Sequence, residues 1–552
     1  MAGSGWRVAS PSESSKANVR ITSFWTFCLA SQLVAQQIPP IGESIEVSIV
    51  NVDVFVTDSQ GHRVQGLKKA DFEIFEDGKR QQITNFAEYR GEQTAAPTVT
   101  ATPATAPTPP PQKRTIVIFV DRFTLPQFRS EPMFGAIRSF LHAVVRPGDA
   151  VSIVSWRRQI ITRLPFTDDL AAIDEVLRKV EKESSFVSVD DQMQILAEQT
   201  FEREIVQFAA QQGVTVDRFA GPTLSGEEGA MRAKFEMQHK VSAMNMLING
   251  ISGREGTKAL ILATHRFSRI AGKEYLVGLN AVLGPPDRER DYDMSREIES
   301  VTKTANANNV RIYALYPEGL GSAAIATAEL RQSPSPVFDA IVLDNELHAM
   351  QEVSSKTGGS LAWGSKNIVD ALPAIKEDFD SYYSLAYRAT TSRADRAHKI
   401  VVKVANRSYT VRARGQYVEK SDTTRMNDRV VANLFGSTSA GIIPVRISLG
   451  MPKKKAKEQR FVPVIVSFPS AALTTLAQKG AFSVYIGSGN ALGQVTQVTH
   501  QTQSFAIPPN AKPGDFTYEF ELLVDGKTTL VSIGVIDEVS KEFGLARVVP
   551  LR

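Results

Sequence analysis

Runs of apolar residues alternate with segments of helical periodicity across the middle of the chain. The clearest run occupies residues 116–120, is rich in β-branched side chains and ends at Asp121. Such a run is typical of a strand buried on both faces of a parallel sheet. Residues 150–155, 259–263 and 310–315 repeat the pattern. Because helical segments separate these runs, the pattern predicts an α/β fold with a doubly wound, mainly parallel sheet.

The segments between these strands predict helices of ordinary length. Their apolar residues recur three and four positions apart. Pro147 and Gly148 end the first of these helices, and either Thr167 or Asp168 caps the next. Gly358 follows a later helix, at a position where glycine often closes one. The predicted helices cover residues 133–145, 170–180, 190–212, 227–249, 295–308, 346–356 and 368–379.

The flanks of this block alternate apolar and polar residues, which predicts half-buried strands. Residues 43–92 form a small β unit with an Asp-Gly pair typical of a tight hairpin turn. Residues 382–418 contain further strands, and neither segment has enough strands to be stable alone. We therefore expect the two segments to pair in one sandwich, with the block at residues 114–381 inserted between them. Residues 430–552 contain strand signals separated by turns, which predicts a second, independent β-sandwich.

Composition adds a linker and a compartment to this plan. Residues 93–113 are dominated by Ala, Thr and Pro, which favours an extended linker without core residues. Lys16 and Arg20 precede an apolar stretch that ends at Ala35. This order is typical of a secretory signal peptide over residues 1–35 and predicts a secreted or periplasmic protein. A disordered leader or a weak N-terminal anchor is the alternative.

Cysteine content and charge exclude several kinds of site and partner. Cys28 is the only cysteine in the 552 residues and lies inside the expected signal peptide. Removal of that peptide would leave no disulfide and no thiolate metal site. The formal net charge of +4 is small for this length, so nucleic acid is not expected as a partner. No segment after the expected signal peptide is apolar enough to suggest a transmembrane span.

Three groups of residues resemble one known family in their order and spacing. They read Val-Asp-Val-Phe-Val-Thr-Asp at 52–58 with Gly-Leu-Lys-Lys-Ala-Asp-Phe-Glu-Ile-Phe-Glu-Asp-Gly at 66–78, Ile-Val-Ile-Phe-Val-Asp at 116–121, and Tyr-Tyr-Ser-Leu-Ala-Tyr at 382–387 with Val-Arg-Ala-Arg-Gly-Gln-Tyr at 411–417. From about residue 45 to residue 417 the chain resembles the VWFA-related proteins of acidobacterial type, which contain a von Willebrand factor type A (VWA) domain. The resemblance implies an extracytoplasmic protein that binds a protein partner at the carboxyl edge of the sheet, for adhesion or another interaction, and catalyses no reaction.

VWA domains usually hold Mg²⁺ at that edge, through an Asp-x-Ser-x-Ser loop, a later threonine and a further aspartate. The resemblance places Asp121 at the first aspartate, but Phe123 and Leu125 stand at the serine positions. The further aspartate falls at or near His265, and Thr223 is a candidate for the threonine. Mg²⁺ prefers several hard oxygen ligands. We therefore expect a degenerate site without a bound cofactor, in which Asp121 is the one metal ligand or else caps a helix or accepts backbone hydrogen bonds.

Other motifs give little support to catalysis. The sequence has no Gly-x-Ser-x-Gly elbow, no His-Glu-x-x-His helix and no Gly-x4-Gly-Lys-Ser/Thr loop. His239 and His348 are expected on solvated helix faces. The glycine-rich run at residues 487–493 follows a strand and predicts a hairpin loop. The lysine run at 453–457 is either a solvated hairpin tip or a contact for an anionic glycan or lipid.

Two alternatives to metal-independent protein binding stay open at this point. The first is metal-dependent adhesion through a non-standard site at Asp121. The second is a periplasmic hydrolase whose active site lies between domains, which would need an acid–base pair in a closed cleft. A cation-dependent change in thermal stability would favour the first alternative over metal-independent binding.

Overall fold

The structure is a computed structural model, and it describes most of the chain from residue 49 onwards. The described residues are 49–90, 93–94, 113–123, 125, 131–183, 220–252, 254, 256–273, 275–276, 288–317, 336–389, 395–434, 441–455, 459–476, 478–490, 495–507, 514–525 and 528–549. The chain divides into two compact units, Ser44–Asp428 and a second that contains Arg429–Arg552. The expected signal peptide with Cys28 and the predicted helix at 190–212 lie outside the described residues.

A six-stranded sheet forms the centre of the first unit. Its order is β11-β10-β9-β6-β7-β8, and every pair is parallel except β7 with β8. The strands are β6 (Arg114–Asp121), β7 (Ala150–Trp156), β8 (Ile160–Thr167), β9 (Thr257–Ala263), β10 (Val310–Tyr316) and β11 (Leu361–Trp363). The order is that of a doubly wound sheet. The predicted mixed α/β class with a mainly parallel sheet is confirmed.

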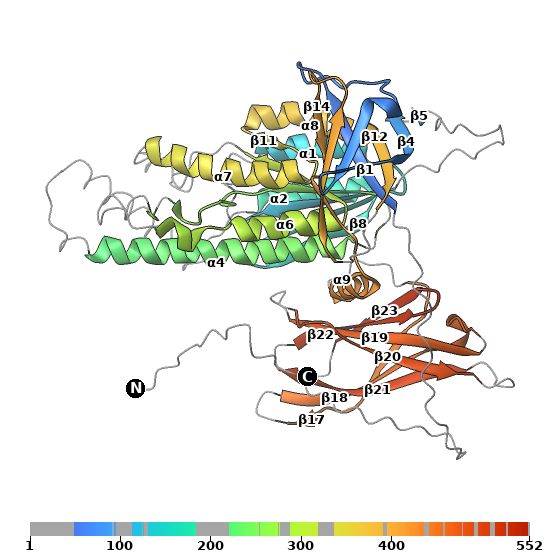
Figure 1. Ribbon diagram of the computed structural model, residues 1–552. Coiled ribbons are helices and arrows are strands. Elements are labelled where there is room, and N and C mark those ends of the chain that lie inside the picture. The colour runs from blue at the N-terminus through green and yellow to red at the C-terminus, as the bar shows by residue number, and fades with distance from the viewer. Residues whose placement is uncertain are drawn as a thin grey trace, which may run out of the picture. The chain divides into compact units, whose positions relative to one another are not determined.

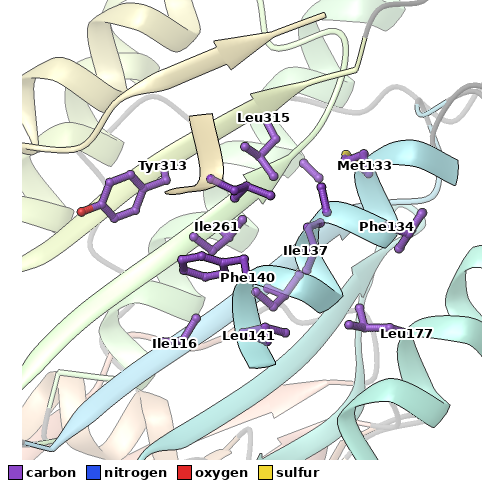
Figure 2. Close-up of a cluster of buried hydrophobic side chains, with 14 of the residues drawn as sticks. Ile116, Met133, Phe134, Ile137, Phe140, Leu141, Leu177, Ile261, Tyr313 and Leu315 are labelled. Carbon is purple, nitrogen blue, oxygen red and sulfur yellow. The ribbon is translucent and has the colours of Figure 1, made fainter. Parts of the chain in front are cut away.

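Helices cover both faces of this sheet, as Figure 1 shows. Ile116 and Ile118 of β6 belong to one buried cluster, whereas Val117 and Phe119 belong to another, because neighbouring strand residues face opposite sides. In Figure 2 the α1 side chain of Phe140 lies over the strands among Ile116, Ile261 and Leu315. The first cluster is covered by α1 (Glu131–Val144), α2 (Leu170–Lys182) and α8 (Ser365–Asp380), and the second by α4 (Ala220–Gly250), α6 (Ser295–Ala307) and α7 (Pro336–Lys356).

Several elements differ from the predicted boundaries. α4 begins at Ala220 and α7 at Pro336, earlier than predicted. Pro336 occupies the first helical position, which tolerates proline because its missing N–H would have no helical partner there. The prediction missed this start signal. β8 was also missed; it is an edge strand and contains Pro165, which a central strand would not accommodate.

Asp169, and neither Thr167 nor Asp168, caps α2. Its carboxylate accepts hydrogen bonds from the backbone N–H groups of Ala171 and Ala172. Asp169→Ala is expected to lower the free energy of unfolding by about 1 kcal/mol, because two helix N–H groups lose their acceptor. Urea unfolding measures this loss. Arg178→Ala, an exposed change on the same helix, should stay within about 0.5 kcal/mol of the wild type; equal losses in both variants would contradict the capping role.

Strands from both sides of the α/β block share two further sheets in the first unit. β1 lies between β12 and β14, and β13 pairs with β2. The sheet orders are β14-β1-β12-β4-β5 and β15-β13-β2-β3, and both sheets supply one buried core. The strands are β1 (Ile49–Thr57), β2 (Phe72–Glu76), β3 (Lys79–Gln81), β4 (Ile83–Arg90), β5 (Gln93–Thr94), β12 (Ser381–Arg388), β13 (Ala397–Val404), β14 (Thr410–Ala413) and β15 (Gln416–Val418), and a 3-10 turn, η1, covers Lys69–Asp71. Because β5 pairs with β4, the first two residues of the expected linker are strand instead.

A buried carboxylate joins these strands to the α/β sheet. Asp378 of α8 is 0% exposed and accepts hydrogen bonds from Arg412 at 2.6 and 2.7 Å and from Tyr313 at 2.9 Å. Arg63 forms a further ion pair with Asp378. The guanidinium groups of Arg63 and Arg412 also lie 5.0 and 4.7 Å from the centre of the Phe55 ring. One buried carboxylate therefore pairs with two partly buried arginines, one from the loop after β1 and one from β14.

The second unit contains two four-stranded antiparallel sheets that share one hydrophobic core. One sheet consists of β16 (Arg446–Leu449), β17 (Lys453–Lys454), β18 (Gln459–Pro469) and β21 (Asp515–Asp525). The other consists of β19 (Lys479–Asn490), β20 (Thr499–Ala506), β22 (Thr528–Asp537) and β23 (Phe543–Val548). A 3-10 turn, η5, covers Ser470–Ala472 in this unit, and another, η3, covers Arg288–Tyr292 in the first unit. Helix α9 (Asp422–Leu434), which was not predicted, precedes these sheets. The missed signals are the helical spacing of Met426, Val430 and Leu434, and Ser421, whose hydroxyl accepts the Thr424 N–H as a cap.

Candidate binding site at the carboxyl edge of the sheet

Asp121 stands at the carboxyl end of the central strand β6, and its side chain is 0% exposed. One carboxylate oxygen, Oδ1, accepts a hydrogen bond from the backbone N–H of Phe123 at 3.0 Å. The Asp121 backbone carbonyl accepts another from Leu125 at 3.1 Å. The carboxylate thus holds the loop that follows β6, while its second oxygen, Oδ2, faces the end of the neighbouring strand.

Lys240 of α4 brings an ammonium group to that second oxygen. Its Nζ lies 2.6 Å from Asp121 Oδ2, and it donates hydrogen bonds to the backbone carbonyl of His265 at 2.7 Å and the hydroxyl of Thr264 at 3.1 Å. Thr264 in turn donates to Asp121 Oδ2 at 2.7 Å. Only 2% of Lys240 is exposed. Three oxygens from the ends of β6 and β9 therefore surround one buried cation that the protein itself supplies.

This arrangement does not fit a Mg²⁺ site of the VWA type. Mg²⁺ needs about six oxygen ligands in a regular octahedron. The side chain of Phe123 packs against the core on one face of the sheet and that of Leu125 is buried in the core on the other, so neither serine position supplies an oxygen. The Asp121 carboxylate already contacts an ammonium group, which repels a second cation. Among the described residues, no three His, Cys, Asp or Glu side chains form a group that could hold a metal.

His265, at the position expected for the further aspartate, is buried at the end of β9. Its ring stacks on Tyr316, with 4.2 Å between the ring centres, and Nε2 lies 3.0 Å from the backbone carbonyl of Pro317. Burial lowers the pKa of His265 to about 4, because the charged imidazolium loses its hydration. His265 contributes its backbone carbonyl to the cation network.

The lowered pKa of His265 makes a stability prediction with a definite sign. Below the unfolded pKa of about 6.5 the unfolded chain gains a proton that the folded chain accepts only near pH 4. The folded state should therefore lose up to about 3 kcal/mol of stability as the pH falls from 6.5 to 4. Urea unfolding at several pH values, followed by the fluorescence of Trp156 and Trp363, measures this loss in the first unit. His265→Gln should lose less over the same interval; an equal loss would contradict the assignment.

A cavity of about 200 Å³ lies beside the buried cation, between α4, α7 and the loops that follow β6, β7 and β9. Phe123, Trp156 and Phe235 supply aromatic surface to it, and Lys240 contributes the side chain that reaches Asp121. Phe235 itself is 55% exposed at α4. The cavity therefore combines apolar walls with a charged, buried floor, as small binding sites commonly do.

The charges around this cavity are unequal. Arg158, Arg232 and Arg266 line it, whereas the acidic side chains are Glu236 and Glu346, and the charge of Lys240 is balanced by Asp121. Burial raises the pKa of Glu346, because its charged carboxylate loses hydration. Glu346 also accepts a hydrogen bond from the backbone N–H of Arg266 at 3.0 Å. The cavity therefore has an excess of positive charge.

Two of these arginines hold an unusual backbone conformation. Arg158 follows β7 with a φ of 59°, and Arg266 follows β9 with a φ of 53°. Residues other than glycine and asparagine adopt this left-handed backbone conformation at a cost of about 1–3 kcal/mol, and such residues cluster at binding sites. Arg158 lies 4.4 Å from the centre of the Phe123 ring and 2.9 Å from Glu236, which fixes it against the cavity wall.

The other residues and runs singled out in the sequence lie at several places in the structure. Thr223 lies in the first turn of α4, and its side chain is outside the described residues. His348 is exposed in the middle of α7 and not near its start, while His239 lines the cavity. The glycine-rich run begins inside β19 and the lysine run begins in the short strand β17; the next described elements after them are the strands β20 and β18.

The sequence pattern around Lys240 indicates that this lysine is buried, which the prediction missed. Met237, Lys240 and Met244 recur at helical spacing on the face of α4 that packs on the sheet, and both methionines are buried. A lysine in such a stripe must find an acceptor, because a buried charge without one is very costly. Asp121 at the end of the central strand is the nearest carboxylate that the fold offers.

No protein-family model matches the sequence, and no curated protein matches it. Among solved structures, the conserved hypothetical protein BatB from Bacteroides thetaiotaomicron is 16% identical, with a TM-score of 0.26 over 48% of this chain and 96% of that one. The vWF domain of the type V pili tip protein Mfa5 from Porphyromonas gingivalis is 10% identical, with a TM-score of 0.26 over 48% and 94% of the two chains. A von Willebrand factor type A protein from Catenulispora acidiphila is 9% identical, with a TM-score of 0.24 over 87% and 73%. Likenesses of this size carry no argument about function. None of the described helices is long and apolar enough to cross a membrane.

Proposed function

We propose that this chain is an extracytoplasmic VWA-like protein of the VWFA-related type, which binds a protein partner at the carboxyl edge of its α/β sheet without a bridging metal and catalyses no reaction. The strand order of the sheet, the motifs around residues 52–78, 116–121 and 382–417, and the cavity at that edge support this proposal. The proposal includes export by the segment at residues 1–35.

The observation that carries the proposal is the position of the Lys240 ammonium group. It lies 2.6 Å from Asp121 Oδ2, where a VWA domain would place its cation against the first aspartate. A covalently attached cation has no dissociation constant, so Asp121 keeps its counter-charge at any concentration of divalent cation. Binding at this edge then depends on the surrounding side chains and on shape, as at most protein interfaces.

Capture of a partner tests this function directly. The purified chain would be immobilised and exposed to an extracytoplasmic extract of the producing organism, once with Mg²⁺ and once with EDTA. We expect the same partner in both conditions, and weaker capture by Arg158→Glu, which reverses one charge at the edge. Arg178→Glu on α2 is the matched control, because it changes the net charge equally on an exposed helix face. Loss of capture in EDTA, or equal capture by the two variants, would contradict the proposal.

Metal-dependent adhesion and hydrolysis would each require a different arrangement of side chains. Metal-dependent adhesion would require Lys240 to leave Asp121, so that the carboxylate could bind a cation. A periplasmic hydrolase would need an acid–base pair in a closed cleft between domains. The metal-independent interaction agrees best with the contacts of Asp121.

A further inference from the structure

The size of the edge cavity limits what it can hold. Its volume is about 200 Å³, below the range of roughly 300–1,000 Å³ typical of sites for drug-sized ligands. An apolar cavity of about 150 Å³ already accepts a benzene ring. The cavity therefore has room for one large side chain, and a single aromatic anchor that enters a pocket is a common centre of protein interfaces.

The walls of the cavity suit an aromatic ring. Phe123 and Trp156 offer apolar surface inside it, and Arg158 lies 4.4 Å from the centre of the Phe123 ring. At the mouth, Phe235 is 55% exposed, and Met231 one helical turn earlier is 52% exposed. Large apolar side chains this exposed on a helix that otherwise packs on a sheet are typical of an interaction surface.

The charges around the mouth of the cavity favour acidic residues next to the aromatic residue of the partner. Arg232 and Arg266 line the cavity together with Arg158 and outnumber the acidic residues there. Arginine forms bidentate hydrogen bonds with carboxylates and also stacks on aromatic rings. Lys240, at 2% exposure, is already neutralised by Asp121 and supports the floor rather than the rim. A positive rim around an aromatic pocket therefore complements an aromatic residue that has acidic neighbours.

We infer that the cavity between α4 and α7 takes an aromatic side chain from an acidic segment of a protein partner, with a carboxylate of that segment paired to Arg232. This inference rests on the proposed function and names the chemistry of the partner at the same site. It differs from metal-bridged recognition because the anchor is apolar and every cation belongs to the protein.

Fluorescence anisotropy with short labelled peptides tests the inference on the full chain in EDTA. The probe is an acidic peptide with one central phenylalanine; one matched peptide has alanine at the centre, and another has every acidic residue replaced by its amide. We expect the probe to bind at least about 10-fold more tightly than either matched peptide. Equal binding of the alanine peptide would overturn the aromatic anchor, and equal binding of the amide peptide would overturn the role of the arginines.

Variants of the protein locate the binding. Arg232→Glu is expected to weaken binding of the probe at least about 10-fold, whereas Arg178→Glu, the matched charge reversal on α2, should leave it unchanged. Phe235→Ala is a second variant that removes an exposed ring and should also weaken binding while the chain stays folded. If the probe does not bind, or binds both charge variants equally, the inference is overturned. Metal-independent capture of a partner in the earlier experiment would then leave the proposed function intact, so the two failures are distinguishable.

Discussion

Replacement of Lys240 by methionine is expected to lower the free energy of unfolding of the Ser44–Asp428 unit by about 3–5 kcal/mol. Methionine preserves most of the volume and the apolar stem but removes the ammonium group. Asp121 is fully buried, and its carboxylate would keep the hydrogen bonds from Phe123 and Thr264 but lose its ammonium partner. A buried carboxylate without a cation is unstable, because the lost hydration is no longer offset.

A double-mutant cycle separates this coupling from general damage to the core. Asp121→Asn combined with Lys240→Met removes both charges, and the pair should be less destabilised than the sum of the single variants by about 1–3 kcal/mol. Urea unfolding followed by tryptophan fluorescence reports on this unit, because Trp156 and Trp363 are the only tryptophans after residue 35. Strict additivity would mean that the Asp121–Lys240 contact contributes nothing to stability.

Replacement of Asp378 by alanine is expected to have an effect of similar size, about 3–5 kcal/mol. The change removes the carboxylate that pairs with Arg412 and Arg63, and with it the acceptor of the Tyr313 hydroxyl. Among the ion pairs of the described residues, Arg63 keeps only its longer contact with Glu377. Arg412 comes from β14, Arg63 from the loop after β1, and Tyr313 from β10. The loss should therefore loosen the contact between the small β strands and the α/β sheet.

Two further variants sharpen this second prediction. Asp378→Asn keeps the shape but removes the charge, and it should lose nearly as much stability as alanine if charge is what the two arginines need. Asp370→Ala on the exposed face of the same helix should stay within about 0.5 kcal/mol of the wild type. Urea unfolding measures all three variants. A near-neutral Asp378→Asn would show that packing and not charge holds this junction.

The main features of the α/β block could be predicted from the sequence because each rests on a strong local pattern. The run at residues 116–120 has no polar side chain, and such a run is stable only when both of its faces are covered. The prediction of strands on both sides of the block agrees with the pairing of β1 with β12. In contrast, two elements were missed. The pattern of β8 is interrupted by a proline, and that of α9 runs across a domain boundary.

The candidate site was less accessible to sequence reasoning, because its contacts join distant segments. Asp121 was identified from its place after the central strand, but the lysine that meets it comes from the middle of α4. A single lysine in a helix is most often solvated, and only its place between Met237 and Met244 argues otherwise. Thr264 and the carbonyl of His265 complete the network through positions that no side-chain motif specifies.

Thermal unfolding in the presence of divalent cations tests the central claim most directly. The full chain and Asp121→Ala would be melted with Mg²⁺, with Mn²⁺ and with EDTA, because a cation that binds only the folded state must raise the Tm as its concentration passes the Kd. With Lys240 against Asp121, the wild-type Tm should be the same in all three conditions. A cation-dependent rise in the Tm of the wild type that disappears in Asp121→Ala would contradict the account and make Asp121 a metal ligand.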